Sequence, residues 1–101
     1  MEKRRPHHDL VAFKAAFSTS QALAVTATAL KDALALGYLR QGMVEVFQSM
    51  EPRHFYKSMT ALSDHTTWHD VYHVRHGGRA LYVKFTDDRV TTFRLLAFKE
   101  R

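Results

Sequence analysis

The sequence contains no cysteine, two prolines, four glycines and no hydrophobic run of about 18 residues. Without cysteine there are no disulfides, thiolate metal ligands or cysteine nucleophiles, and a cytoplasmic protein is favoured. The short apolar runs exclude a membrane-spanning helix, and the charged N-terminus lacks the apolar core of a secretion signal. Because no linker, repeat or low-complexity segment divides the chain, we expect a single domain over residues 1–101.

The composition is that of a small folded protein with excess positive charge. Of its 101 residues, 46% are hydrophobic and 25% are charged, which argues against disorder. A domain of this size has little room for an enclosed pocket. The net charge of +5 therefore suggests a large anionic partner that approaches an open surface.

The positive charge is concentrated in the second half of the chain. Residues 1–52 carry six Lys and Arg against five Asp and Glu, whereas residues 53–101 carry nine against five. The second half also holds five of the seven histidines, three of the four tyrosines and the single tryptophan. Cations interleaved with rings suit a surface that binds phosphates and stacks bases. The alternative is the ordinary solvated face of a mixed sheet.

The first half has the apolar spacing of helices. Leu10, Phe13 and Phe17 place one stripe along a helix. Gly37 is suited to end a later helix, and Pro52 to stop the last one. The predicted elements are a helix over 7–17, a short strand over 21–25, a helix over 29–36 capped by Thr26 or Thr28, and a helix over 40–50.

The second half has the alternation of strands. Leu81, Val83 and Phe85 are apolar, while Tyr82 and Lys84 between them are polar, which predicts a strand with one solvent-facing side. We therefore expect an α+β fold in which N-terminal helices pack on one face of a mostly antiparallel sheet. The predicted strands are 55–59, 68–75, 79–85 and 90–98, with turns at Gly77-Gly78 and Asp87-Asp88.

A row of histidines raises the question of a metal site. His65, His69 and His73 are four residues apart, and on a helix they would share one face. The surrounding residues indicate a strand, on which four residues span about 13 Å. Zinc needs each ligand nitrogen at about 2 Å, so we expect no metal site. A catalytic His69 and an inert surface His69 both remain open.

A long motif in the centre of the chain carries a family resemblance. It consists of Phe55-Tyr56-Lys57-Ser58-Met59-Thr60, Ser63-Asp64-His65-Thr66 and Trp68-His69-Asp70-Val71-Tyr72. This string resembles the MqsR (motility quorum-sensing regulator) toxin family. The first residues, Met1-Glu2-Lys3-Arg4, look like that family's N-terminus, and the segments 82–84 and 97–100 resemble its last two strands. The resemblance therefore runs through the whole chain.

The resemblance implies a RelE/YoeB-like α+β fold and a function. Members of the family are small cytoplasmic mRNA endonucleases that act without a metal or other cofactor and prefer short GC-containing sites. They are the toxins of type II toxin–antitoxin systems. The implied partners are mRNA and an MqsA-like antitoxin, a zinc-containing, DNA-binding protein that sequesters the toxin. No membrane association is expected, and no DNA binding except through the antitoxin complex.

The resemblance also implies catalytic roles for Lys57, His69, Tyr82 and Lys99. At position 69 the family member compared has Gln, so the chain departs from the pattern there. Cleavage without a metal uses the 2′-OH of RNA as nucleophile and needs proton transfer and a stabilised phosphate. We predict that Lys57 and Lys99 place charge on the phosphate, that His69 transfers a proton, and that Tyr82 orients the 2′-OH or the phosphate or shares the proton transfer.

Four further residues are predicted to bind RNA, namely Met59, Trp68, Arg75 and Arg79. Each site residue has an ordinary structural alternative, such as a solvated strand lysine or a cross-strand packing tyrosine. Two other functions therefore stay open. One is a nucleic-acid-binding module without catalysis, and the other is a protein-interaction domain that docks on an acidic partner.

Overall fold

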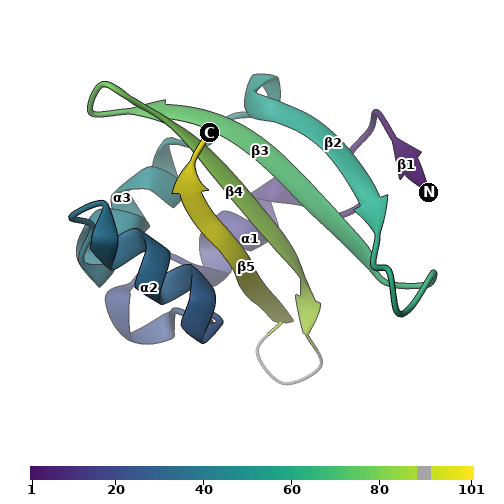
Figure 1. Cartoon of the computed structure of the whole chain (residues 1–101), viewed down its shortest axis with the longest axis horizontal. Helices are drawn as coiled ribbons and strands as arrows, with labels where there is room; N and C mark the ends of the chain where they lie inside the picture. Colours follow the sequence, from purple (N-terminus) through teal and green to yellow (C-terminus); the bar gives the residue numbers. More distant parts are fainter. Residues whose placement is uncertain (89–91) are drawn as a thin grey trace.

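Helices precede an antiparallel sheet in the fold (Figure 1). The computed structural model describes residues 1–88 and 92–101. This arrangement confirms the α+β prediction. The elements in chain order are β1 (Glu2–Lys3), α1 (Leu10–Ala16), η1 (Ser20–Ala22), α2 (Ala27–Ala35), α3 (Arg40–Ser49), η2 (Pro52–His54), β2 (Phe55–Thr60), β3 (Trp68–His76), β4 (Arg79–Asp88) and β5 (Thr92–Glu100).

The sheet is a meander in which each strand is hydrogen-bonded to the next one along the chain. Within the described residues it has five strands in the order β1-β2-β3-β4-β5, all antiparallel to their neighbours. The four long strands were predicted, but β1 was missed because a two-residue strand shows no alternation. The missed strand places Glu2 opposite Met59 at the edge of β2.

Side-chain caps set the helix boundaries. Asp9 accepts hydrogen bonds from amides of the first turn, so α1 begins at Leu10 and not at residue 7 as predicted. Thr26, one of the two predicted caps, accepts from the amide of Ala29 at 3.1 Å at the start of α2. Gly37 follows that helix with φ of 89°. None of the helices in the described residues has the length and apolar character needed to cross a bilayer.

Two local predictions were wrong. Residues 21–25 do not form a strand, because Ser20–Ala22 take a 3₁₀ turn and Val25 makes an isolated parallel bridge to Leu95. Asp87-Asp88 does not begin a turn, because β4 continues through both residues, which pair with β5. Cross-strand pairing overrides the turn preference of aspartate there. The predicted start of the last strand, Val90, lies outside the described residues.

The core lies between the helices and one face of the sheet. Leu81, Val83 and Phe85 are fully buried, as their alternation predicted. Phe13 of α1 stacks on Phe85 with ring centroids 3.8 Å apart and meets Phe47 of α3 edge-on at 5.5 Å. Figure 1 shows α1 behind the sheet and, in the part of the chain that is described, no helix in front of β3 and β4. The other side of the sheet is therefore left uncovered by helices.

A buried carboxylate holds the N-terminal segment on the helix-covered side. Asp70 accepts hydrogen bonds from the amides of His7 and His8 at 3.1 and 2.9 Å and from the hydroxyl of Ser58 at 2.6 Å. These bonds compensate for removing the carboxylate from water. They also fix the segment between β1 and α1, and so keep β1 beside β2.

Candidate functional site

Strand register brings the predicted catalytic residues to the sheet face opposite the helices, here called the open face. Directly paired residues of antiparallel strands point to the same side, and side chains alternate along each strand. Lys57 of β2 pairs with Val71, and His69 lies two residues before Val71 on β3. On its other side Val71 pairs with Lys84 of β4, which lies two residues after Tyr82. Tyr82 in turn pairs with Lys99 of β5. Successive strands thus contribute Lys57, His69, Tyr82 and Lys99 to one face.

A row of rings and ammonium groups crosses the open face. Tyr56 stacks on His73 with centroids 4.1 Å apart, and the His73 ring lies 5.9 Å from that of Tyr82. Lys99 Nζ lies 5.2 Å from the centroid of the Tyr82 ring. A β-bulge near the start of β2 turns both Tyr56 and Lys57 to this face, so that Lys57 Nζ lies 5.5 Å from the Tyr56 ring. The row connects β2 to β5.

The lysines of the open face differ in their electrostatic surroundings. Lys57 Nζ donates to a Glu2 carboxylate oxygen at 2.7 Å, and this hydrogen bond raises the pKa of Lys57. Partial burial lowers the pKa of Lys84, and the charge of Lys99 lowers it further. A phosphate beside Lys84 would supply the negative charge that its surroundings lack. Lys84 therefore belongs with the site, two residues after Tyr82.

The surroundings of His69 favour its neutral form. Burial lowers its pKa, and the charges of Lys84 and His8 lower the pKa further. The lowered pKa favours the neutral imidazole, which is the form that a general base needs. His69 pairs across the strands with Met59. Together with Lys84 these residues border a hollow of about 520 Å³ at the loop end of β2 and β3.

The histidine row lies along a strand, as predicted. His69, His73 and His76 belong to β3, and His65 lies in the loop before it. Alternation places His69 and His73 on the open face, whereas His76 is on the helix side, where the Tyr38 hydroxyl lies 3.2 Å from its Nδ1. Over residues 1–88 and 92–101, no three His, Asp or Glu side chains are grouped so as to hold a metal ion.

Several residues of the open face were not predicted as site residues from the sequence, namely Glu2, Tyr56, His73 and Lys84. His73 and Lys84 had a detectable signal, because each lies an even number of residues from a predicted site residue on the same strand. Glu2 and Tyr56 had none, because a two-residue strand and a bulge cannot be recognised from alternation.

The residues predicted to bind RNA are divided between the two faces. Met59 and Arg75 lie on the open face. Trp68 directly precedes His69 on β3 and points to the other side, where an imidazole of the N-terminal segment stacks on it at 5.3 Å. Arg79 also lies on the helix side and donates a hydrogen bond to the carbonyl at the C-terminal cap of α2. The structure therefore does not bring Trp68 and Arg79 together with the other site residues.

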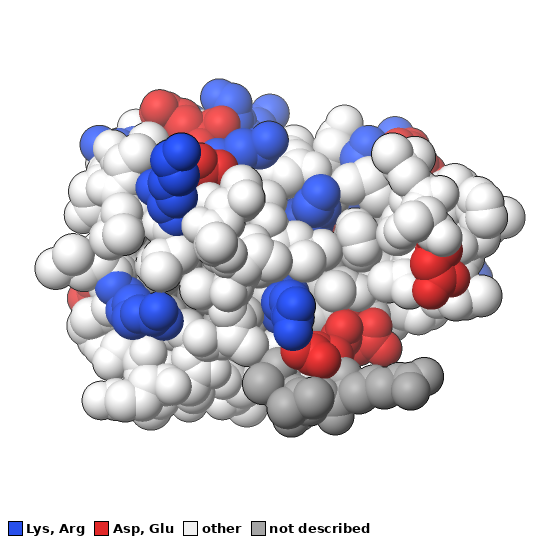
Figure 2. Space-filling model, turned by 60° about the horizontal axis from the view of Figure 1, so that its bottom comes forward, with Lys and Arg blue, Asp and Glu red and all other residues white. Residues whose placement is uncertain are grey.

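The charge on the side of the molecule drawn in Figure 2 is dispersed. Lys and Arg atoms are separated there by uncharged surface, and Asp and Glu atoms lie beside several of them. Ion pairs such as Arg53 with Glu51 and Arg94 with Asp88, each at 3.1 Å, compensate part of the positive charge. The side drawn in Figure 2 therefore offers a polyanion separate cations and not one continuous cationic patch.

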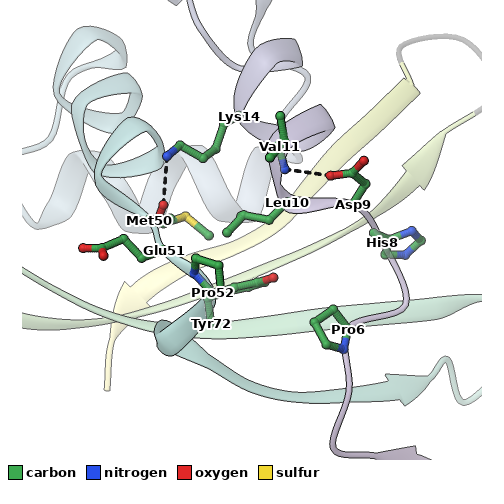
Figure 3. Close-up of a pocket in the computed structure, with 10 residues that line it drawn as sticks. All are labelled: Pro6, His8, Asp9, Leu10, Val11, Lys14, Met50, Glu51, Pro52 and Tyr72. Atoms are coloured by element: carbon green, nitrogen blue, oxygen red, sulfur yellow. Dashed lines mark hydrogen bonds between the residues drawn. The ribbon is translucent and has the colours of Figure 1, made fainter.

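A second hollow, of about 340 Å³, lies between the start of α1 and η2 (Figure 3). Tyr72, a core residue, lines it, so this hollow is on the helix side of the sheet. Among its charged lining residues, Lys14 donates to the carbonyl of Met50 at 2.9 Å, Asp9 accepts from the amide of Val11, and Glu51 accepts from Arg53 at 3.1 Å. These polar groups hold helix ends, and the open face remains the better surface for a polyanion.

Comparison with known proteins agrees with the resemblance seen in the sequence. Residues 5–100 match the family described as the motility quorum-sensing regulator, toxin of MqsA. The chain belongs to the MqsR toxin family. It is also 39% identical over 101 residues to the mRNA interferase toxin MqsR of Escherichia coli (strain K12), a match that covers 100% of both chains. Because the match covers both chains in full, it includes every residue of the open face of this MqsR-family protein.

Proposed function

We propose that this protein is the toxin of a type II toxin–antitoxin pair and an endoribonuclease that cleaves mRNA on its open face. Membership of the MqsR toxin family and the name of the E. coli relative support the activity. The proposal rests on strand register, by which four successive strands contribute Lys57, His69, Tyr82 and Lys99 to the same face, the one without helices. An extended RNA strand can reach such a face along its length.

The proposed reaction begins with attack by the 2′-OH of RNA on the adjacent phosphorus. His69 takes the 2′-OH proton, which its neutral imidazole can accept because burial lowers its pKa. The new bond from O2′ to phosphorus forms as the bond to the 5′-oxygen breaks, and the leaving oxygen takes up a proton. The products are a 2′,3′-cyclic phosphate and a 5′-OH end.

Tyr82 and the lysines act on the phosphate. Burial raises the pKa of Tyr82, with the charge of Lys57 acting in the opposite direction, so the phenol stays protonated and can donate. It orients a phosphate oxygen or protonates the leaving 5′-oxygen. The ammonium groups of Lys57, Lys84 and Lys99 stabilise the charge that develops on the pentavalent phosphate. Side chains thus supply every role, and the proposed reaction needs no metal ion.

The proposed substrate is mRNA cut at short GC-containing sites, in line with the family resemblance. The proposed regulator is an MqsA-like antitoxin, because the family description names MqsA as the partner of these toxins. On this proposal the antitoxin supplies the DNA binding of the complex. Expression of the chain alone should arrest growth, and co-expression of the antitoxin should relieve the arrest.

Primer extension on a purified transcript tests the proposed function. The wild-type protein in EDTA should cut the transcript at discrete sites, and Lys57→Ala should lose most of that cleavage. Lys31→Ala, an exposed lysine on α2, is the matched control and should cut normally. Intact transcripts with salt-dependent binding would instead indicate a nucleic-acid-binding module without catalysis.

A further inference from the structure

The hollow bordered by His69 and Lys84, here called the loop hollow, extends beyond the groups used in the chemistry proposed above. Its other lining residues are Met59 and Thr60 at the end of β2 and residues 61–63 of the following loop. Its volume of about 520 Å³ is within the range of sites for small organic groups. The two groups at one side belong to the cleavage site, so the hollow continues directly from it.

The loop hollow combines apolar walls with cationic groups. Met59 is half-buried, and Leu62 is fully exposed at the rim. A single exposed leucine is unremarkable on most surfaces, but this one borders a hollow beside the site. The ionisable side chains that line it are His69 and Lys84, with no carboxylate among the lining residues of the described chain. The hollow therefore suits an apolar group attached to an anionic backbone.

Hydrogen bonds hold the loop in place before any ligand binds. Asp64 accepts from the Thr66 amide and hydroxyl at 2.9 and 2.6 Å and from the Thr67 hydroxyl at 2.8 Å. These bonds lower the pKa of Asp64 to about 2. The amide of Ala61 donates to the Thr67 carbonyl at 2.9 Å, which closes the base of the loop. A preformed hollow loses less conformational entropy on binding.

We propose that the loop hollow binds one nucleobase of the single-stranded RNA, next to the phosphate that is cleaved. The inference rests on the proposed function and adds a base-binding subsite to it. A nucleobase offers two apolar faces, which Met59 and Leu62 can contact, and polar edges within reach of the hydroxyls of Thr60 and Ser63. Its sugar-phosphate backbone then passes Lys84 and His69.

Two matched substitutions test the subsite in the full-length protein. Leu62→Ala removes the exposed side chain at the rim, and Leu39→Ala removes another exposed leucine, which precedes α3. Leu62→Ala should raise KM for a short oligoribonucleotide about fivefold to tenfold, with kcat within about twofold, because a stacked base contributes to binding more than to the chemical step. Leu62→Phe, which keeps a large apolar side chain, should have a KM close to that of the wild type. Leu39→Ala should change neither KM nor kcat. Primer extension should show altered site preference for Leu62→Ala alone.

A binding measurement separates this inference from the proposed function. The probe is an RNA oligonucleotide with a 2′-O-methyl group at the attacking position and 2-aminopurine beside it. Its fluorescence should change on binding the wild-type protein, and Leu62→Ala should weaken that binding about fivefold to tenfold. Equal KM, site preference and probe affinity for the Leu62 and Leu39 variants would overturn the subsite, even if cleavage itself is observed. Unchanged cleavage by Leu62→Ala with loss of antitoxin neutralisation would overturn it too, since the hollow would then dock a protein.

Discussion

The two faces of this sheet differ in how deeply their side chains are buried and in the effect of that burial. On the helix-covered face, Leu81, Val83 and Phe85 are fully buried, and the carboxylate of Asp70 is paired on several sides. On the open face, Tyr82 and Lys84 of the same strand are half-buried and polar. Full burial stabilises the fold, whereas partial burial leaves ionisable groups accessible and shifts their pKa values.

Val71 shows how the open face is organised. It is fully buried although it points away from the helix-side core. Its direct cross-strand partners are Lys57 and Lys84, and side chains of directly paired residues lie next to each other on the same face. Packing on Val71 limits the motion of both lysines. The cations of the open face are therefore held in position before RNA binds, which favours a stabilising role at the phosphate.

The largest expected effect on the open face comes from His69→Ala. Removal of a proton-transfer group should lower kcat by about 10²- to 10⁴-fold while leaving the urea midpoint nearly unchanged. His65→Ala, an exposed histidine in the preceding loop, is the control and should retain activity. Single-turnover cleavage of an oligoribonucleotide measures the effect. A loss of less than about tenfold would remove His69 from the chemistry.

The corresponding substitution on the helix-covered face is Phe13→Ala. It removes a ring that stacks on Phe85 at 3.8 Å, and it should lower the free energy of unfolding by about 3–5 kcal/mol. Val11→Ala on the same helix is the control, because Val11 is 76% exposed, and it should cost about 0.5 kcal/mol or less. Urea denaturation checks both. If the two variants were equally stable, the contrast between the faces would be lost.

Local patterns predicted most of the fold, but only part of the site. Alternation in β4 predicted which side of the strand faces the core and which faces solvent. Gly77 and Gly78, with φ of 57° and 80°, make the predicted hairpin turn. Glu2 and Tyr56 escaped notice because their positions depend on pairing and on a bulge, which are set by distant residues. Trp68 was assigned to RNA by residue type, although its place next to His69 already put it on the opposite side.

The pH dependence of cleavage sharpens the contrast in burial. Because burial, Lys84 and His8 lower the pKa of His69 below its ordinary 6.5, the base is neutral above that range. Activity should therefore be constant near neutrality and fall about tenfold per pH unit once the pH drops below the lowered pKa. His69→Gln should abolish this acid limb in a plot of kcat/KM against pH. An inflection above 6.5 would contradict the assignment.

The smallest expected effect concerns Glu2, the carboxylate that β1 brings to the open face. Its hydrogen bond to Lys57 at 2.7 Å neutralises a cation that RNA would otherwise meet. Glu2→Gln should therefore strengthen binding of an uncleavable oligoribonucleotide by about twofold to fivefold at low salt, and the gain should vanish in high salt.

Glu51→Gln is the matched control for this effect, since Glu51 pairs with Arg53 at 3.1 Å in the η2 region and not on the open face. It should leave RNA affinity unchanged, as measured by fluorescence anisotropy across a salt series. Weaker binding by Glu2→Gln would mean that the carboxylate positions Lys57 for RNA instead of competing with the phosphate for it. In that case β1 would be a part of the binding site, and the open face would owe its order to ion pairing as well as to packing on Val71.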